Sequence, residues 1–311
     1  MDTLPLGSPT PSTPHHRDTL LDAPDARARR WDKRIDRLVG GCYRLRRRIG
    51  NGSGGAVYEA RHEPSGERVA VKILHERFKG SDQQRRRFER EARTAAVIHH
   101  PHIVRLYHAG CDPDGTAWQV LELLAGRDLA SALEERPLAI GEVRALADQL
   151  LSAIEAVHTR GFVHRDVKPE NVFLLDEAPS DAPLAIKLLD FGIAKPLVPT
   201  DSLPFITEEG VLLGTPHYMA PEQVTGEQPV SPATDLWAVG AVLFTALTGR
   251  APFEEAQLSR LLVRIAREPA PSVGFYRPDV PTDLAEVVAR ALRTHPAHRY
   301  HSARQMRAAL G

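Results

Sequence analysis

The stretch from His164 to Asn171 constrains the fold most, because it places several charges directly beside an apolar segment. It contains a carboxylate at Asp166, a cation at Lys168 and a side-chain amide at Asn171. Residues 172–175 follow at once and are apolar, which predicts that the charged loop is fixed to a short buried strand. The fold must therefore hold a polar loop against its core.

The three polar side chains of this loop suit one kind of chemistry. Asp166 can accept a proton from a hydroxyl nucleophile, and Lys168 can neutralise the charge on a moving phosphoryl group. Asn171 can offer its side-chain oxygen to Mg²⁺. Phosphoryl transfer needs mainly positioning and charge neutralisation, so the loop predicts a phosphoryl-transfer site.

Length and composition limit the class of protein. The 311 residues suggest two domains or lobes, and 42% hydrophobic and 26% charged residues are typical of a globular chain. The formal net charge of zero gives no bias towards nucleic acid, so no nucleic-acid partner is expected. Cys42 and Cys111 are the only cysteines, which favours a reducing cytoplasm over a disulfide framework. No apolar run reaches the roughly 18 residues of a membrane span, so we expect a soluble cytoplasmic protein.

The N-terminal residues divide into two parts. Residues 1–23 are rich in Pro, Ser and Thr, which predicts a disordered arm. In residues 24–42, Trp31, Ile35 and Leu38 fall at positions i, i+4 and i+7. This spacing predicts an amphipathic helix from Asp25 to Val39, docked on the lobe that follows.

The next part of the chain has the pattern of a β-sheet. Residues 43–49, 56–62 and 67–74 are short strand-like runs separated by turns that contain Gly or Pro. Residues 50–57 form a G-x-G-x-x-G-x-V pattern, in which glycines let backbone N–H groups approach phosphate oxygens. A dinucleotide-binding fold uses similar glycines but needs a helix after them. Here a strand-like run follows, which favours a phosphate loop within a β-hairpin.

Lys72 is the one cation inside the strand-like run 69–72, and a lone strand lysine is normally solvated. Glu91 makes a binding role more plausible, because it lies beside the apolar stripe of a helical run over residues 83–97. The remaining arginines of that run favour a solvated helix face, with an anion-binding patch as the alternative: Arg85, Arg86, Arg87, Arg90 and Arg93.

Beyond Gly126 the pattern becomes helical. A sustained apolar stripe runs from Val143 to Val157, and residues 233–247 are apolar on nearly every face, which predicts a buried central helix. Three further amphipathic helices are expected, at residues 258–265, 284–292 and 303–310. A β-rich lobe before a helical lobe follows from the pattern alone.

Three more motifs carry charge in apolar surroundings. Residues 189–192, Leu-Asp-Phe-Gly, put the carboxylate of Asp190 after an apolar strand. Residues 214–222 run Gly-Thr-Pro-His-Tyr-Met-Ala-Pro-Glu, and residues 235–240 carry Asp235 on an otherwise apolar helix. A buried carboxylate without partners costs several kcal/mol, so Asp235 must be hydrogen-bonded.

In this order and with these intervals, the motifs resemble those of the protein kinase superfamily over about Tyr43 to Leu310. The chain is most similar to the bacterial eukaryote-like (Hanks-type) serine/threonine kinases, on the strength of Lys168 and Thr215. The resemblance implies an α+β bilobal kinase-like fold. A small β-rich N-lobe with one main helix would span residues 43–122, and a larger α-helical C-lobe would span residues 127–311.

The resemblance also implies the roles of the site residues. The catalytic group would comprise Asp166, Lys168, Asn171, Lys72, Glu91 and Thr215, and Asn171 and Asp190 would hold Mg²⁺, with Mn²⁺ as a substitute. Residues 122–126 would be the hinge that bonds adenine through its backbone. The ATP-binding group would comprise Ile49, Gly50, Asn51, Gly52, Ser53, Gly54, Gly55, Val57, Ala70, Lys72, Leu121, Glu122, Leu124, Phe173 and Asp190.

Several structural and regulatory expectations follow from the same resemblance. Asp235 would bond the backbone around His164 and Arg165, and Glu222 would pair with Arg299. Thr207 would be the main activating phosphosite. Protein substrates with Ser or Thr are expected, with a homodimer as one route to autophosphorylation.

Two other classes of function remain as alternatives. A pseudokinase acting as a scaffold would normally lack Lys72, Asp166 or Asp190, and this chain keeps all three. A small-molecule phosphotransferase of kinase-like fold would share the core but usually lacks the long segment that ends Ala220-Pro221-Glu222. A serine/threonine protein kinase is therefore the favoured interpretation.

Overall fold

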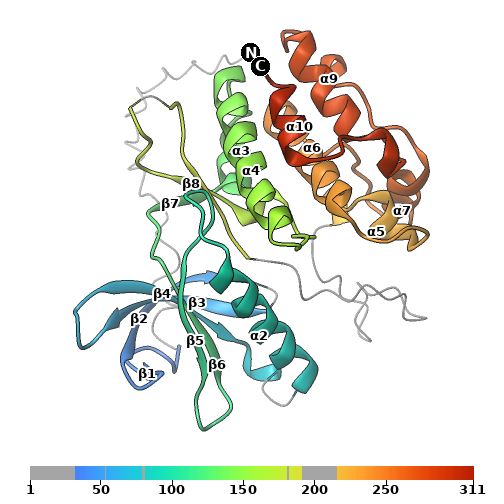
Figure 1. The fold of residues 1–311 in the computed structure, drawn as a ribbon. Coiled ribbons are helices and arrows are strands. Elements are labelled where there is room, and N and C mark those ends of the chain that lie inside the picture. The colour runs from blue at the N-terminus through green and yellow to red at the C-terminus, as the bar shows by residue number, and fades with distance from the viewer. Residues whose placement is uncertain (1–31, 53, 79–80, 181, 191–215) are drawn as a thin grey trace, which may run out of the picture.

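The computed structural model describes residues 32–52, 54–78, 81–180, 182–190 and 216–311. Strands gather in the N-terminal part of these residues and helices in the C-terminal part, so two lobes are evident (Figure 1). The α+β class and the order of the lobes are as the sequence predicts. In the described part of the chain, no helix is both long enough and apolar enough to cross a bilayer.

The N-lobe is built on a six-stranded sheet with the order β1-β2-β3-β4-β6-β5, in which every neighbouring pair is antiparallel. One long helix, α2 (Asp82–Val97), contacts β5 and β6, and the side chain of Ser81 caps its first turn. The strands are β1 (Leu38–Val39), β2 (Tyr43–Asn51), β3 (Gly55–His62), β4 (Arg68–Leu74), β5 (Leu106–Cys111) and β6 (Ala117–Leu121).

The helix expected from Asp25 to Val39 is wrong over its described part, residues 32–39, which form a turn and then strand β1. Asp36 has a φ of 64°, and an L-residue in that region interrupts a right-handed helix. The backbone pairs with the sheet instead, since Asp36 N–H donates to Leu45 O at 2.9 Å. Val39 is fully buried, so the segment does pack on the N-lobe, but as an edge strand.

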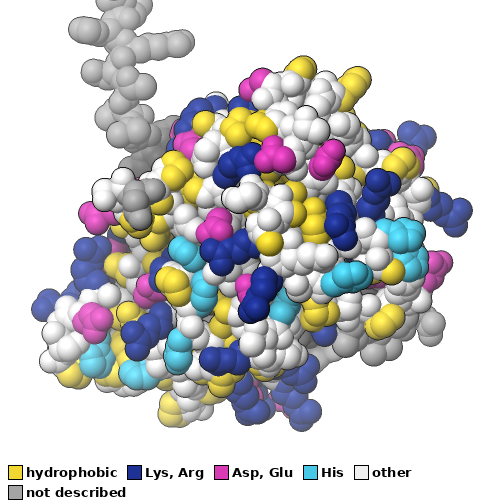
Figure 2. Space-filling view, turned by 45° about the horizontal axis from the view of Figure 1, so that its top comes forward, with side chains coloured by type: hydrophobic (Ala, Val, Ile, Leu, Met, Phe, Trp, Pro, Cys, Tyr) yellow, Lys and Arg dark blue, Asp and Glu magenta, His cyan; other side chains and the backbone are white. Residues whose placement is uncertain are grey.

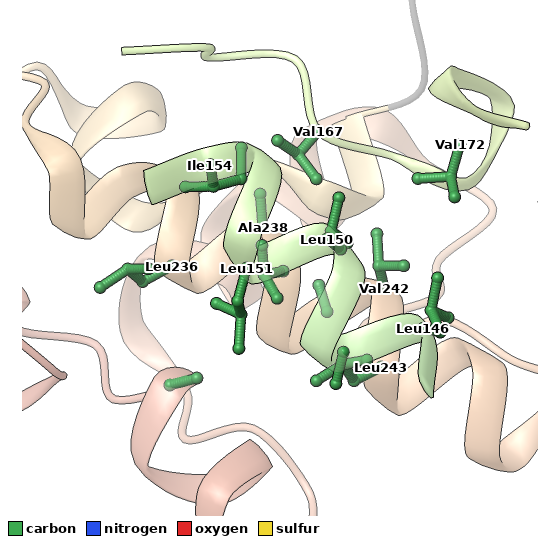
Figure 3. Close-up of a cluster of buried hydrophobic side chains, with 14 of the residues drawn as sticks. Leu146, Leu150, Leu151, Ile154, Val167, Val172, Leu236, Ala238, Val242 and Leu243 are labelled. Carbon is green, nitrogen blue, oxygen red and sulfur yellow. The ribbon is translucent and has the colours of Figure 1, made fainter. Parts of the chain in front are cut away.

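The C-lobe core forms where two long helices meet. Helix α4 (Ile140–Thr159) packs against α6 (Pro232–Thr248), and their apolar side chains point towards one another in Figure 3. Every residue of α6 from Thr234 to Leu247 is buried, as its uniformly apolar sequence predicts. Gly249 ends the helix with a φ of 76°, the left-handed conformation that glycine adopts without strain.

Shorter elements complete the C-lobe. The short helices α3 and α8 and strand β7 escape prediction because too few residues carry their periodicity. The remaining elements are β7 (Gly126–Asp128), α3 (Leu129–Glu135), β8 (Val172–Leu175), β9 (Ile186–Leu188), α5 (Pro221–Thr225), α7 (Leu258–Arg267), α8 (Val273–Tyr276), α9 (Thr282–Ala291) and α10 (Ala303–Ala308).

Surface and buried charges behave differently in this fold. Basic and acidic side chains are interspersed over the face shown in Figure 2, where exposed pairs are screened by water. Glu222 and Arg299 are by contrast enclosed, with side-chain exposures of 1% and 0%, and form two parallel hydrogen bonds of 2.8 Å. Thr234 Oγ1 adds a third bond to Glu222, at 2.7 Å. The predicted Glu222–Arg299 pair is confirmed.

Replacing Glu222 with Gln should destabilise the protein strongly, because it leaves the Arg299 guanidinium buried without a counter-charge. We expect a loss of about 3–5 kcal/mol in the free energy of unfolding, measured by urea denaturation. The control is Asp148→Asn, which breaks the Arg307–Asp148 pair, whose side chains are 40% and 52% exposed. That change should cost less than about 1 kcal/mol. Equal losses in both variants would contradict a special role for the buried pair.

Candidate active site

The register of the N-lobe sheet gathers one set of predicted site residues on a single face. Val57 is directly opposite Lys72, and Ala70 is directly opposite Leu121. Opposite residues of an antiparallel pair lie on the same face, as do residues two apart on one strand. Val57, Ala70, Lys72 and Leu121 therefore share a face, while the other face of β4 buries Val69, Val71 and Ile73 in the N-lobe core.

Lys72 is held between two carboxylates. Its Nζ donates to Glu91 Oε1 at 2.9 Å and to Asp190 Oδ1 at 2.7 Å, and only 9% of its side chain is exposed. Glu91 comes from α2, and Asp190 follows β9 in the C-lobe, so one ammonium group joins three elements of two lobes. The predicted Lys72–Glu91 contact is confirmed, and Asp190 is a partner that the sequence did not reveal.

The electrostatics of this cluster keep Lys72 charged. Burial opposes the charge, but the attraction of Asp190 and Glu91 outweighs it and raises the pKa of Lys72 above its ordinary value. Burial also raises the pKa of Glu91, and repulsion from Asp190 and Asp166 adds to this, against the attraction of Lys72. One ammonium group thus faces two carboxyl groups, and a further cation beside Asp190 would be stabilised.

The glycine-rich segment closes on itself at the end of β2. Gly52 N–H donates to Gly55 O at 2.9 Å, which makes a tight hairpin. A Cβ added at Gly55 would lie 2.4 Å from the carbonyl oxygen of Ile73, so only glycine fits there. Ile49, Gly50 and Asn51 lie at the end of β2, and Gly54 precedes β3. Ser53 lies outside the described residues.

Asp235 anchors the loop that carries Asp166. Its two carboxylate oxygens accept the backbone N–H groups of His164 and Arg165, each at 2.8 Å, and the side chain has no exposed surface. The predicted role of Asp235 is therefore confirmed. His158 Nε2 lies 2.8 Å from the same carboxylate, a contact that sequence reasoning missed. Arg165 has a φ of 66°, so the loop backbone is held in a conformation that non-glycine residues seldom adopt.

Asp166, Lys168 and Asn171 are close together, as the loop sequence predicts. Lys168 Nζ donates to Asp166 Oδ2 at 3.0 Å. Asn171 Nδ2 donates to the same oxygen at 3.0 Å and to the Asp166 carbonyl at 2.7 Å. These bonds fix the carboxylate, and Lys168 supplies a cation beside it. The side chains of Asp166 and Lys168 remain 20% and 17% exposed, so a ligand can reach them.

The short sheet β7-β8-β9 forms the C-lobe side of the site. Phe173 on β8 is opposite Asp128 on β7 and Lys187 on β9. Leu189 N–H donates to Asn171 O at 2.8 Å, which brings Asp190 alongside the loop. Asp190 has a φ of 37°, a strained conformation of the kind that often marks a functional residue.

The segment after β6 presents free backbone groups. Glu122 N–H donates to Arg105 O at 3.0 Å, so this N–H is already used. Among the described residues, no hydrogen bond involves the Glu122 carbonyl or the backbone of Leu124. Both residues belong to the segment 122–126, which the family resemblance assigns to adenine binding. The Glu122 carboxylate is instead bonded to Lys187 and Arg105, which sequence reasoning also missed.

The oxygen donors present fit a hard divalent cation. No described residue donates a hydrogen bond to Asn171 Oδ1, and Asp190 adds a carboxylate that is 46% exposed. Within the described ranges, no cluster of three or more His, Cys, Asp or Glu side chains could hold a metal alone. A divalent ion at Asn171 and Asp190 would therefore share its coordination with the phosphates of a nucleotide, as Mg²⁺ commonly does.

Two predicted site residues, Thr207 and Thr215, lie outside the described residues, so their roles stay predictions.

A cavity of about 900 Å³ lies elsewhere, along α2 and β5, and none of the predicted site residues lines it.

Comparison with known proteins agrees with this geometry. Residues 43–308 match the model of the protein kinase domain. The chain is 41% identical over 278 residues to the serine/threonine-protein kinase Pkn1 of Myxococcus xanthus, covering 88% of this chain and 39% of Pkn1. It is 35% identical over 274 residues to PknA of Mycobacterium tuberculosis, covering 86% of this chain and 60% of PknA. The chain thus spans only part of these relatives.

Solved structures show the same fold. The kinase domain of PknI from Mycobacterium tuberculosis superposes with a TM-score of 0.67 at 29% identity, covering 89% of this chain and 98% of the PknI domain. The fold, the motifs and the relatives thus agree. The chain belongs to the protein kinase family, among the bacterial Hanks-type serine/threonine kinases.

Proposed function

We propose that this chain transfers the γ-phosphoryl group of ATP to Ser and Thr hydroxyls of proteins. The observation that carries the proposal is Lys72, held at 2.9 Å from Glu91 and 2.7 Å from Asp190 beside the Asp166 loop. Protein kinases use ATP with a divalent metal ion, and an active site needs the lysine–glutamate pair and the metal-binding aspartate in place together. A pseudokinase would not need to keep this cluster assembled, and the names of the relatives favour protein substrates.

The nucleotide would lie between the two sheets. Gly50, Gly52 and Gly55 would cover its phosphates with backbone N–H groups, and Lys72 would hold the α- and β-phosphates. The adenine would bond the backbone of the 122–126 segment. Val57 and Ala70 would cover it from the N-lobe and Phe173 from the C-lobe. Ile49, Asn51, Ser53, Gly54 and Leu121 would complete the pocket.

Asn171 and Asp190 would hold Mg²⁺, for which Mn²⁺ could substitute. When bound, the ion supplies positive charge that neutralises the phosphate oxygens during transfer. Asp166 would orient the acceptor hydroxyl and take its proton as the new O–P bond forms and the bond to ADP breaks. Lys168, 3.0 Å from Asp166, would stabilise the charge on the moving phosphoryl group.

The proposal also includes the cellular location of the reaction and the association of two copies of the chain. A cytoplasmic location suits a kinase that draws on ATP, and Cys42 and Cys111 are both free. A transient homodimer, in which one copy presents its activation segment to another, would be one route to autophosphorylation.

Asp166→Ala should abolish transfer while sparing nucleotide binding, because the carboxylate touches the acceptor hydroxyl and not ATP. The expected fall in kcat is about 10²–10⁴-fold, measured with labelled ATP, Mg²⁺ and a Ser/Thr peptide pool. ATP affinity measured by calorimetry should change by less than about threefold. Asp283→Ala, which removes an exposed carboxylate paired with Arg144, is the control and should keep full activity. Full activity in Asp166→Ala would refute the mechanism.

A phosphorylated Thr207 would act on the loop through Arg165. Burial lowers the pKa of Arg165, Asp235 opposes this, and the positive charge of Arg90 on α2 lowers it further. A phosphate group near Arg165 and Arg90 would be attracted to both guanidinium groups. Thr215 lies too near the Ala220-Pro221-Glu222 anchor to reach them, by resemblance to related kinases, and its hydroxyl would serve Asp166 and Lys168. Thr207 lies eight residues earlier, where similar kinases place an autophosphorylated threonine.

Thr207→Ala should therefore lower kcat, and mass spectrometry of active protein should find phosphate on Thr207. We expect a loss of at least about tenfold, because phosphorylation makes one to three charge-assisted hydrogen bonds that order the segment. Arg90→Gln should reduce the benefit of phosphorylation without changing the activity of Thr207→Ala. Undiminished activity in Thr207→Ala would exclude this residue as the main activating site.

A further inference from the structure

Lys187 occupies an unusual place for a solvent-seeking side chain. It is the middle residue of β9, between Ile186 and Leu188, which are 1% and 0% exposed. Its side chain lies on the opposite face of β9 from theirs, and only 17% of it is exposed. The lysine is thus enclosed at the boundary between the lobes and needs a defined partner.

That partner is the carboxylate of Glu122, the first residue after β6. Glu122 Oε1 accepts Lys187 Nζ at 2.8 Å and the backbone N–H of Arg105 at 2.7 Å. The Glu122 N–H donates in turn to Arg105 O at 3.0 Å. One carboxylate therefore joins the segment after β6, the residue before β5 and the middle of β9. It is 21% exposed, so these charge-assisted bonds are less screened than a surface pair.

Strand β9 leads to groups on which nucleotide binding would depend. Lys187 is the cross-strand partner of Phe173, which would contact the adenine from the C-lobe. Leu188 bonds residues 102 and 104 through its backbone, at 2.8 and 3.0 Å, and Asp190 follows two residues later. The Glu122–Lys187 pair therefore connects the start of the 122–126 segment to the strand beside Phe173.

We propose that Lys187 and Glu122 form a positioning pair that fixes the width of the adenine pocket and so sets the affinity for ATP. Lys187 acts through Glu122 and β9 and does not itself touch the nucleotide. The inference rests on the proposed ATP-dependent function. It deepens that function by naming a side-chain pair that governs nucleotide affinity without either side chain contacting the nucleotide.

The pair should govern affinity and not the transfer step. Asp166 is fixed by its own bonds to Lys168 and Asn171, and its loop is anchored by Asp235. None of these bonds passes through Lys187. Loosening the pocket would therefore remove binding that is equal in the ground and transition states, which raises KM and leaves kcat unchanged.

The test compares three substitutions of Lys187. Lys187→Met should raise the KM for ATP about five- to tenfold, the size expected from losing a charge-assisted hydrogen bond, with kcat within about twofold. Lys187→Arg keeps the charge and should keep KM within about twofold of the parent. Lys187→Glu places two carboxylates together and should raise KM further than Met does. Calorimetric titration with ADP should give the same order of affinities.

A matched control separates positioning from general destabilisation. Glu142 is also 21% exposed, and it also accepts one backbone N–H and one cation, from Ala139 at 2.7 Å and Arg136 at 2.8 Å. Glu142→Gln should lower the unfolding free energy about as much as Lys187→Met and leave the KM for ATP unchanged. Hydrogen exchange at the Glu122 amide in nucleotide-free protein should quicken in Lys187→Met and not in the control.

The outcomes distinguish this inference from the proposed function. If the parent protein shows no ATP-dependent phosphorylation, the proposed function fails, but exchange at Glu122 and ADP affinity still test the pair. If the parent is active and Lys187→Met keeps KM within twofold, the positioning role is refuted. An equal rise in KM in Glu142→Gln would also refute it, since the effect would then be one of stability alone.

Discussion

The carboxylate of Asp235 is the contact on which the site depends. It is fully buried on α6, the helix at the centre of the C-lobe, and it bonds the backbone of His164 and Arg165 at 2.8 Å. A buried charge is costly unless its partners are complete, and here backbone N–H groups and His158 supply them. The rigid apolar core thereby fixes a polar loop, so the position of Asp166 is set by the packing of α4 on α6.

A second constraint links the lobes through charge. Lys72 lies on the N-lobe sheet, Glu91 on α2 and Asp190 after β9, and the bonds of 2.9 and 2.7 Å require all three elements to be in place. Neither strand β4 nor helix α2 alone could supply both partners that the buried ammonium group of Lys72 requires. The sheet register decides which face Lys72 points to, since a shift by one residue would turn Lys72 towards the core and move Val69, Val71 and Ile73 out of it. The alternation of buried apolar residues on β4 therefore fixes the direction in which Lys72 points.

How well an element or contact could be predicted from the sequence depended on the length and regularity of its residue pattern. The uniformly apolar α6 and the G-x-G-x-x-G turn could be derived, because each rests on a strong periodicity or a motif of fixed spacing, whereas the Glu222–Arg299 pair was implied by the family resemblance alone. The helix prediction is wrong for residues 32–39, since three apolar residues at helical spacing cannot reveal the positive φ of Asp36. The contacts of Lys187 with Glu122 and of His158 with Asp235 join residues far apart in sequence. No local pattern carries such information, although a lysine between buried neighbours, as at Lys72 and Lys187, is a signal worth following.

Lys72 and Lys187 each form an ion pair that connects the two lobes. Each lies on a strand with buried neighbours and reaches a carboxylate on the other lobe: Lys72 to Asp190, Lys187 to Glu122. The first pair lies within the proposed nucleotide site, and nucleotide binding would exchange its partners, since phosphates would attract Lys72 and the metal ion would attract Asp190. The second pair uses the side chain of Glu122 and not the backbone groups proposed for adenine, so it would keep its partners throughout. The Lys187–Glu122 pair can therefore hold the two lobes in place while Lys72 and Asp190 exchange partners. For this reason nucleotide affinity should depend on Lys187, although its side chain does not contact the nucleotide.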